Sequence, residues 1–137
     1  MKREISDESR RWFLQAKDEF QDADDLRKRS RFYLALFHFQ QAAEKALKAF
    51  LYSAVPSEEV FFTHSIYELV EMAQENDSDF KQISKASKLD EYYIPTRYPN
   101  GLPGAVPSQF YQDPGEAEEA MLLAKSVIEM VGEKLDR

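Results

Sequence analysis

Cysteine is absent from this 137-residue chain, which excludes a disulfide framework, a thiolate metal site and a cysteine nucleophile. Glycine is scarce, and its four scattered residues cannot form a glycine-rich phosphate loop. No apolar run reaches the roughly 18 residues that a membrane span requires, and the first residues lack the apolar stretch of a signal peptide. We therefore expect a cytoplasmic protein without membrane association.

Positive charge is also in the minority, because 18 Lys and Arg residues face 25 Asp and Glu residues and leave a net charge of −7. Such a chain does not attract nucleic acid or anionic membranes in general, since its summed field has the wrong sign. A local basic surface could still bind an anion within about 10 Å. The length corresponds to about one domain, which we expect to span residues 1–137.

Helical periodicity of apolar residues is the main pattern in the sequence. Apolar residues recur at spacings of three and four over residues 7–29, 31–52, 66–73, 79–93 and from residue 114 to the end. Ser6 or Asp7, a Ser65–Glu68 capping box, and Asp113 followed by Pro114 mark three helix starts. The pattern predicts an all-α, up-and-down bundle of about five helices. The second helix is apolar over more than half its circumference, which is typical of a bundle centre or an oligomer interface.

The segment 95–115 differs from the rest, because it holds five of the six prolines and three of the four glycines. Proline prevents regular helix there, so the sequence predicts a connection of about 19 residues without secondary structure. Connections of this length tend to be functional or bound to a partner. Its aromatic residues Tyr98, Phe110 and Tyr111 indicate that it packs against something.

Three local patterns carry a family resemblance. They are FQQAAEKALKA at residues 39–49, THSI at residues 63–66 and YYIPTRYP at residues 92–99. In this order and helical setting they resemble the HEPN domain (higher eukaryotes and prokaryotes nucleotide-binding). The resemblance covers nearly the whole chain and implies a helical bundle, frequently a homodimer, often encoded beside and bound to a minimal nucleotidyltransferase in a toxin–antitoxin type of pair.

Many members of that family are metal-independent ribonucleases with an Arg, four to six intervening residues and a His late in the domain. Here no His follows Arg97. Arg31 and His38 have the spacing, with six residues between them, but they lie in the second helix, where the motif is not expected. We therefore predict that the usual catalytic pair is absent, and whether the chain is an enzyme stays open. Arg97, His64 and His38 are the weak catalytic candidates.

A polar stripe on the second helix is the first candidate binding surface. Its members lie within about 100° of one another on a 3.6-residue helix, and they are Arg31, His38, Gln41, Lys45 and Lys48. Such a stripe could bind a nucleotide phosphate or an RNA backbone. Alternatively, it is a solvated face in which Glu44 and Lys48 form an i,i+4 pair. His38, between aromatic residues, could move protons or could simply be a hydrogen-bonded interface residue.

Arg97 is the residue that we favour most. At the start of the long connection it could grip a phosphate or a partner carboxylate with two N–H groups, or it could pin the connection to a helix C-terminus. Tyr98 could accept a nucleotidyl group or pack. His64 precedes a helix, where it could bind a carboxylate, bind a phosphate or act as a cap.

The leading functional prediction is a small HEPN-like protein that binds a nucleotide, a nucleotidyltransferase partner, or both. The predicted binding residues are Arg97, Tyr98, Lys45, Lys48, Gln41 and His64, and no cofactor or metal is expected. The alternative is a metal-independent RNA endonuclease in which Arg97 and a displaced His form a composite site across a dimer. A third possibility is a structural subunit whose basic stripe has no ligand.

Overall fold

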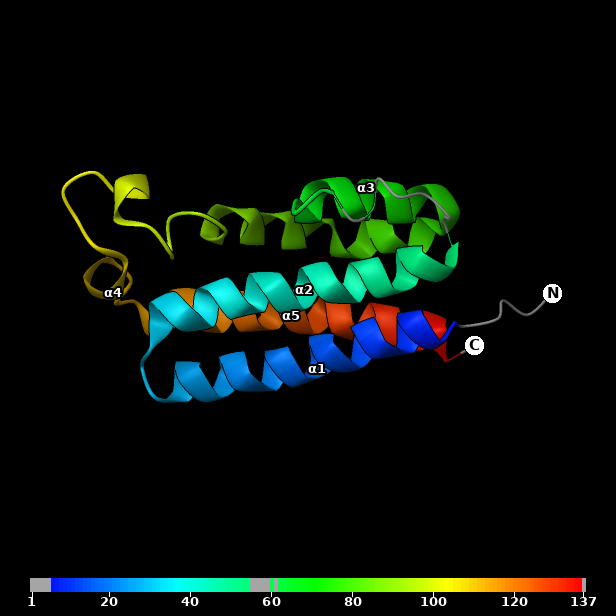
Figure 1. Cartoon of the computed structure of the whole chain (residues 1–137), viewed down its shortest axis with the longest axis horizontal. Coiled ribbons are helices and arrows are strands. Elements are labelled where there is room, and N and C mark those ends of the chain that lie inside the picture. The colour runs from blue at the N-terminus through cyan, green and yellow to red at the C-terminus, as the bar shows by residue number, and fades with distance from the viewer. Residues whose placement is uncertain (1–5, 55–59, 61, 137) are drawn as a thin grey trace.

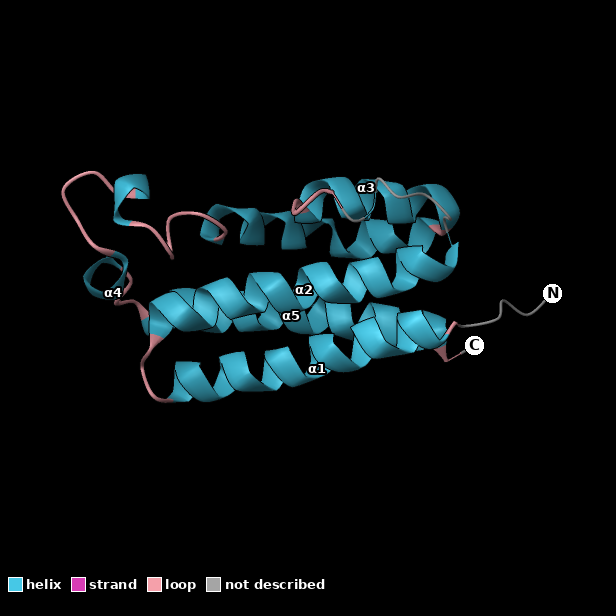
Figure 2. Cartoon of the chain, viewed as in Figure 1, coloured by secondary structure: helices cyan, strands magenta, loops and turns pink. Residues whose placement is uncertain are grey.

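The protein is described by a computed structural model that covers residues 6–54, 60 and 62–136. The long helices lie side by side, and the described ranges contain helices, turns and loops only (Figures 1 and 2). The elements in chain order are α1 (Asp7–Lys28), α2 (Phe32–Ala54), α3 (Ile66–Asn76), η2 (Ser78–Tyr92), η3 (Pro99–Gly101), α4 (Pro107–Phe110) and α5 (Pro114–Leu135). The predicted all-α bundle is confirmed, and all five predicted helices are present.

Local capping signals set the helix ends close to their predicted positions. The Ser6 Oγ accepts a hydrogen bond from the Ser9 amide at the start of α1. Ser30, with φ of 59°, adopts a left-handed conformation that reverses the chain between α1 and α2 within three residues. Asp113 caps α5, and Pro114 occupies its first turn.

The second helix is the centre of the bundle. It contacts α1, α5, α3 and η2, and its broad apolar face is buried in these contacts. The largest fully buried side chains on α2 are Phe39, Phe50, Leu36, Leu47 and Leu51. Of the two explanations for this wide apolar helix, the bundle centre is the one that the structure of the single chain shows.

Helix η2 carries the chain from α3 to the connection before α5. It forms the predicted fourth helix, but with the tighter 3-10 pattern and a kink at Ile83, where φ is −110° and ψ is 19°. Lys134 near the end of α5 ties this helix into the bundle, since its Nζ lies 2.8 Å from the Asp77 Oδ2 and 2.5 Å from the Asp79 Oδ2. Its hydrogen bonds to these two carboxylates raise the pKa of Lys134.

The proline-rich connection is more ordered than predicted. The expectation of no secondary structure is wrong, because the short helices η3 and α4 each begin with a proline, Pro99 and Pro107, that fixes the first helical φ. The packing prediction holds for Tyr111, whose ring is buried and meets Tyr92 edge-on at 6.1 Å. Tyr98 and Phe110 are about half exposed.

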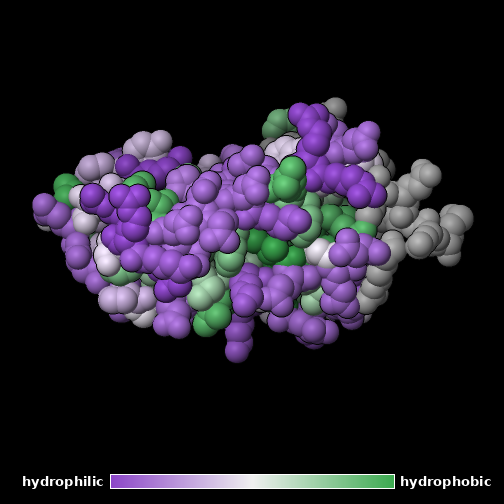
Figure 3. All heavy atoms as spheres, turned by 90° about the horizontal axis from the view of Figure 1, so that it is seen from below, coloured by the Kyte–Doolittle hydropathy of each residue, from purple (hydrophilic) through white to green (hydrophobic). Residues whose placement is uncertain are grey.

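The face seen from below α1 is mostly hydrophilic, with small separate apolar patches (Figure 3). None of the helices in the described ranges combines the length and apolar content that crossing a bilayer requires.

Candidate functional site

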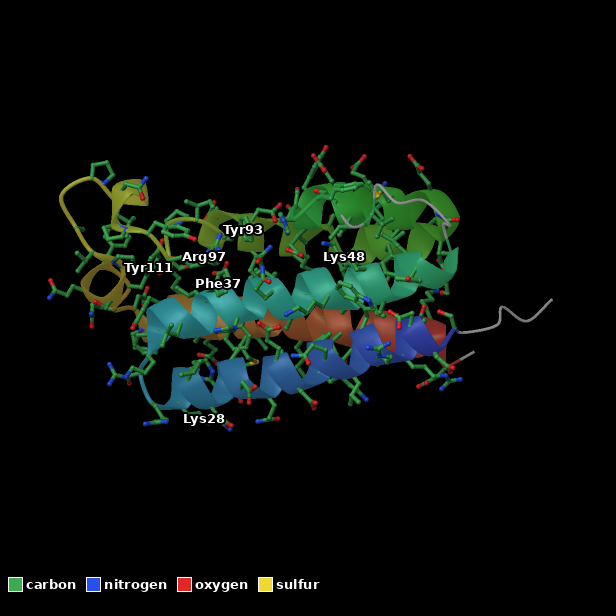
Figure 4. All side chains as sticks on the ribbon, in the orientation of Figure 1. Lys28, Phe37, Lys48, Tyr93, Arg97 and Tyr111 are labelled. Atoms are coloured by element: carbon green, nitrogen blue, oxygen red, sulfur yellow. The ribbon has the colours of Figure 1, made fainter. Side chains whose placement is uncertain are left out.

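A polar and aromatic cluster lies where the C-terminal end of η2 faces α2 (Figure 4). Pro95 has no N–H, so it cannot satisfy the last carbonyl groups of η2. Side chains replace the missing backbone donor: the Thr96 Oγ1 donates to the Tyr92 carbonyl at 2.5 Å, and the Arg97 Nε donates to the Tyr93 carbonyl at 2.7 Å. The local sequence therefore fixes the position of the Arg97 Nε atom, from which the rest of the guanidinium extends.

Three aromatic rings surround that guanidinium. Its central carbon lies 4.4 Å from the ring centre of Tyr93, 4.8 Å from that of Phe37 and 5.0 Å from that of Tyr98. Its two terminal nitrogens have no hydrogen-bond acceptor among the described residues. Since no fully buried side-chain nitrogen or oxygen among the described residues lacks a partner, these nitrogens are not completely buried. Arg97 thus attaches the long connection to the C-terminal end of η2, which was one of its two predicted roles. Its two terminal nitrogens remain as donors without an acceptor.

His64 also contacts Tyr93. The two rings stack with centres 5.0 Å apart and planes 18° apart. The His64 Nδ1 is 3.2 Å from the Glu44 Oε2, and the same oxygen accepts from the Lys48 Nζ at 2.9 Å. With Nδ1 directed at a carboxylate, the Nε2 nitrogen is the one left for an incoming ligand. Of the alternatives considered for His64, which were a carboxylate contact, phosphate binding and a capping role, the structure shows the carboxylate contact.

Glu44 and Lys48 are a buried ion pair, with 5% and 3% of their side chains exposed. Gln40 and Gln41 complete the polar cluster on this face of α2, because Gln40 donates to the His64 carbonyl at 3.0 Å and Gln41 donates to the Gln40 amide oxygen at 2.7 Å. Polar side chains of α2 therefore hold His64 in place, Gln40 at its carbonyl and Glu44 at its ring.

An open depression of about 670 Å³ adjoins His64 and Tyr93. Its other lining residues are Phe62, Thr63, Ser65, Glu68, Met72 and Asp90. Asp90 caps α3 from η2, since its carboxylate accepts from the amides of Ile66 and Tyr67 at 2.6 and 3.0 Å. The predicted capping box is half formed: the Ser65 Oγ accepts from the Glu68 amide, whereas the Glu68 carboxylate accepts from Thr63 at 2.6 Å.

The predicted basic stripe of α2 does not form one exposed track. His38 and Lys45 both contact Glu19 of α1, with the His38 Nδ1 2.7 Å from the Glu19 Oε2. Burial alone would raise the pKa of Glu19, but hydrogen bonds from His38 and Lys45 outweigh it and lower that pKa. Lys48 instead faces Glu44 in the interior. The prediction of one continuous basic surface is wrong, because Glu19 contacts His38 and Lys45 between α1 and α2 whereas Glu44 contacts Lys48 in the interior.

The structure therefore brings Arg97, Tyr98 and His64 to one region and leaves His38 and Lys45 in another, between α1 and α2. Sequence reasoning did not single out Tyr93, Phe37 or Glu44 as site residues. Tyr93 and Glu44 lie inside the patterns that carry the resemblance, which was the available signal. Phe37 reaches Arg97 only through the fold. The described residues contain no group of three or more His, Asp and Glu side chains arranged to hold a metal ion.

Comparisons with a family model and with solved structures point to the same protein family. The family model of the HEPN domain matches residues 9–135. The crystal structure of TT1696 from Thermus thermophilus is similar, with 35% sequence identity, a TM-score of 0.83, and coverage of 95% of this chain and 100% of that one. ST0689, an archaeal HEPN homologue, has 27% identity and a TM-score of 0.74, with 98% and 99% of the two chains covered. The search of curated proteins gave no match.

Proposed function

This chain belongs to the HEPN domain family, and from that premise we propose that it binds the phosphate of a nucleotide through Arg97. The observation that carries the proposal is the guanidinium itself, which three rings and the Tyr93 carbonyl orient, and whose two terminal nitrogens have no acceptor among the described residues. Two parallel N–H donors of a guanidinium match two phosphate oxygens.

Charge neutralisation around the site supports this assignment. The net charge of −7 does not draw anions to the molecule, so phosphate recognition depends on the local field. Lys48 balances the buried Glu44, and Lys45 contacts Glu19. Arg97, in contrast, has no carboxylate partner among the described residues. It is therefore the cation of this site that remains available to a ligand.

His64 supplies the second contact of the proposed site. Its side chain is about half exposed, and its Nδ1 is committed to Glu44. In the neutral ring whose Nδ1–H faces this carboxylate, the Nε2 is an acceptor and can take a hydrogen bond from a ribose hydroxyl. Tyr93 contacts both the imidazole and the guanidinium and so brings the two groups to one region.

The test is equilibrium binding of the four ribonucleoside monophosphates to the wild-type chain and to Arg97→Ala, Arg97→Lys and Arg31→Ala. Arg31 is an exposed arginine at the start of α2 and serves as a matched control for charge. A hydrogen bond to a charged group is worth about 1.5–3 kcal/mol, so Arg97→Ala should weaken binding about 10- to 100-fold. Arg97→Lys should restore little, because it lacks the planar fork. Absence of binding, or equal affinities of Arg97→Ala and Arg31→Ala, would overturn the proposal.

We propose further that the chain forms a homodimer and binds a minimal nucleotidyltransferase, in a toxin–antitoxin type of pair. The segment between residues 94 and 112 supports a protein contact, because Arg97 is its only charged residue. Its exposed apolar side chains are Ile94, Tyr98, Val106 and Phe110. Light scattering tests the dimer, and co-purification with a co-expressed nucleotidyltransferase tests the partner. A monomer at micromolar concentration that captures no such partner would remove this part of the proposal.

A second candidate function, metal-independent RNA cleavage, is favoured by the pairing of His64 with Glu44. A histidine oriented by a carboxylate can move protons, and an adjacent arginine can stabilise the charge that develops on phosphorus. Here both groups come from one chain and flank Tyr93. The wild type should then cleave RNA in the presence of a chelator, and His64→Ala and Arg97→Ala should not. His38→Ala is the control and should still cleave, because His38 contacts Glu19 and lies outside this site. Intact RNA with the wild type would exclude this function.

A further inference from the structure

We propose that the depression beside His64 is a nucleobase pocket in which Glu68 favours guanine. This inference rests on the proposed function and deepens it, since it assigns the base that accompanies the phosphate at Arg97. The depression is lined by flat or apolar side chains, Phe62, His64, Met72 and Tyr93, and its volume of about 670 Å³ is that of a small-molecule site.

The charges along the site give the ligand a direction. Arg97 provides a positive end, and Glu68 and Asp90 provide a negative end, with Tyr93 between them in contact with Arg97 and on the wall of the depression. A nucleotide has the complementary arrangement, because its phosphate is anionic and its base edge carries N–H donors. A nucleotide bound in the opposite direction would place its phosphate against two carboxylates, which repel it.

The N-terminus of α3 does not compete for the phosphate. Amides at the start of a helix commonly bind anions, but here Asp90 already accepts from the amides of Ile66 and Tyr67 and from the Ser65 hydroxyl. The carboxylate of the protein occupies the position that a phosphate would take. Arg97 is then the anion site of this region, and the depression is left for the neutral part of the ligand.

Glu68 is the group that can distinguish one base from another. Thr63 donates to its Oε2 at 2.6 Å and orients the carboxylate, while its Oε1 has no hydrogen-bond partner among the described residues. A carboxylate only accepts hydrogen bonds and has about four lone-pair positions. Guanine offers two adjacent donors, N1–H and N2–H. Adenine and cytosine offer an amino group beside an unprotonated ring nitrogen, and the single ring N–H of uracil lies between two carbonyl oxygens that repel a carboxylate.

The experiment compares GMP, AMP, CMP and UMP on the full-length wild type, on Glu68→Gln and on Glu71→Gln. Glu71 is an exposed glutamate of the same helix that does not line the depression, so it controls for the loss of one charge. We expect GMP to bind about tenfold or more tightly than UMP, as for one hydrogen bond to a charged group. Glu68→Gln should remove this ratio while Glu71→Gln keeps it.

The outcomes separate the two proposals. If the four nucleotides bind alike and Arg97→Ala weakens all of them, phosphate binding stands and the guanine pocket is overturned. If no nucleotide binds, both proposals fall. If a short lysine- or arginine-rich peptide binds in a Glu68-dependent way and GMP does not displace it, the depression accepts a basic side chain of a protein and the base pocket is overturned.

Discussion

Replacing Lys48 by methionine should strongly destabilise the fold, because it leaves a buried carboxylate without its cation. The Lys48 Nζ lies 2.9 Å from the Glu44 Oε2, and neither side chain is more than 5% exposed. Breaking a buried pair by removing one partner costs about 3–5 kcal/mol. With a urea m-value of about 2 kcal/mol per M, that cost lowers the unfolding midpoint by about 1.5–2.5 M. Native stability itself is only about 5–15 kcal/mol.

Urea unfolding followed by circular dichroism at neutral pH is the assay. Lys85→Met, which removes an exposed lysine of η2, is the matched control and should shift the midpoint little. The double variant Glu44→Gln, Lys48→Met should recover most of the loss, since no charge is then left buried. A cost below about 1 kcal/mol for Lys48→Met, typical of an exposed pair, would refute the reasoning. Loss of nucleotide binding at unchanged stability would instead make Lys48 a ligand contact.

Three further predictions concern stability. Asp90→Ala should cost about 1–2 kcal/mol, because the first amides of α3 lose their acceptor; an unchanged urea midpoint would contradict the cap. Gly104→Ala should cost about 1 kcal/mol through backbone strain alone, since φ is +81° and a Cβ there would meet no atom within 4 Å; equal thermal midpoints of the two proteins would argue against it. The lowered pKa of Glu19 means that the unfolded chain binds its proton more readily. The stability from its contacts with His38 and Lys45 is present above the ordinary pKa of about 4.3 and is lost as pH falls through the lowered folded pKa; unfolding midpoints from pH 3 to 6 should show a slope that Glu19→Gln reduces, and equal slopes would count against it.

The helices could be predicted from the sequence because their signals are local. Ser6, the Ser65 cap and the Asp113–Pro114 pair each act within one helical turn, and each caps the helix that it was expected to cap. No local pattern indicated the kink at Ile83. The short helices of the connection were missed because Pro99 and Pro107 were interpreted as helix breakers, whereas each begins a helical turn. Periodicity therefore located the long helices and not the irregular segments between them.

The candidate site was only partly predictable for the same reason. Arg97 and His64 stood out because proline and a helix start flank them. The burial of Lys48 could not be predicted in this way. Helical spacing placed Lys48 on a polar stripe and could not show that α3 and η2 cover that side of α2. The partner of Lys45, Glu19, lies on a different helix. Which cations remain available to a ligand is decided by such contacts between helices.

The order of the helices along the chain has a consequence for folding. Helix α5 packs against α2, η2 and α1, and it buries the side chains Ala117, Ala120, Ala124, Val127 and Val131. The α1–α2 hairpin can form first, because its two helices are adjacent along the chain. One side of α2 then stays uncovered until α5, which comes more than fifty residues later, has packed onto it. An intermediate of this kind exposes apolar surface and is prone to aggregation, so docking of α5 protects the chain as well as stabilising it.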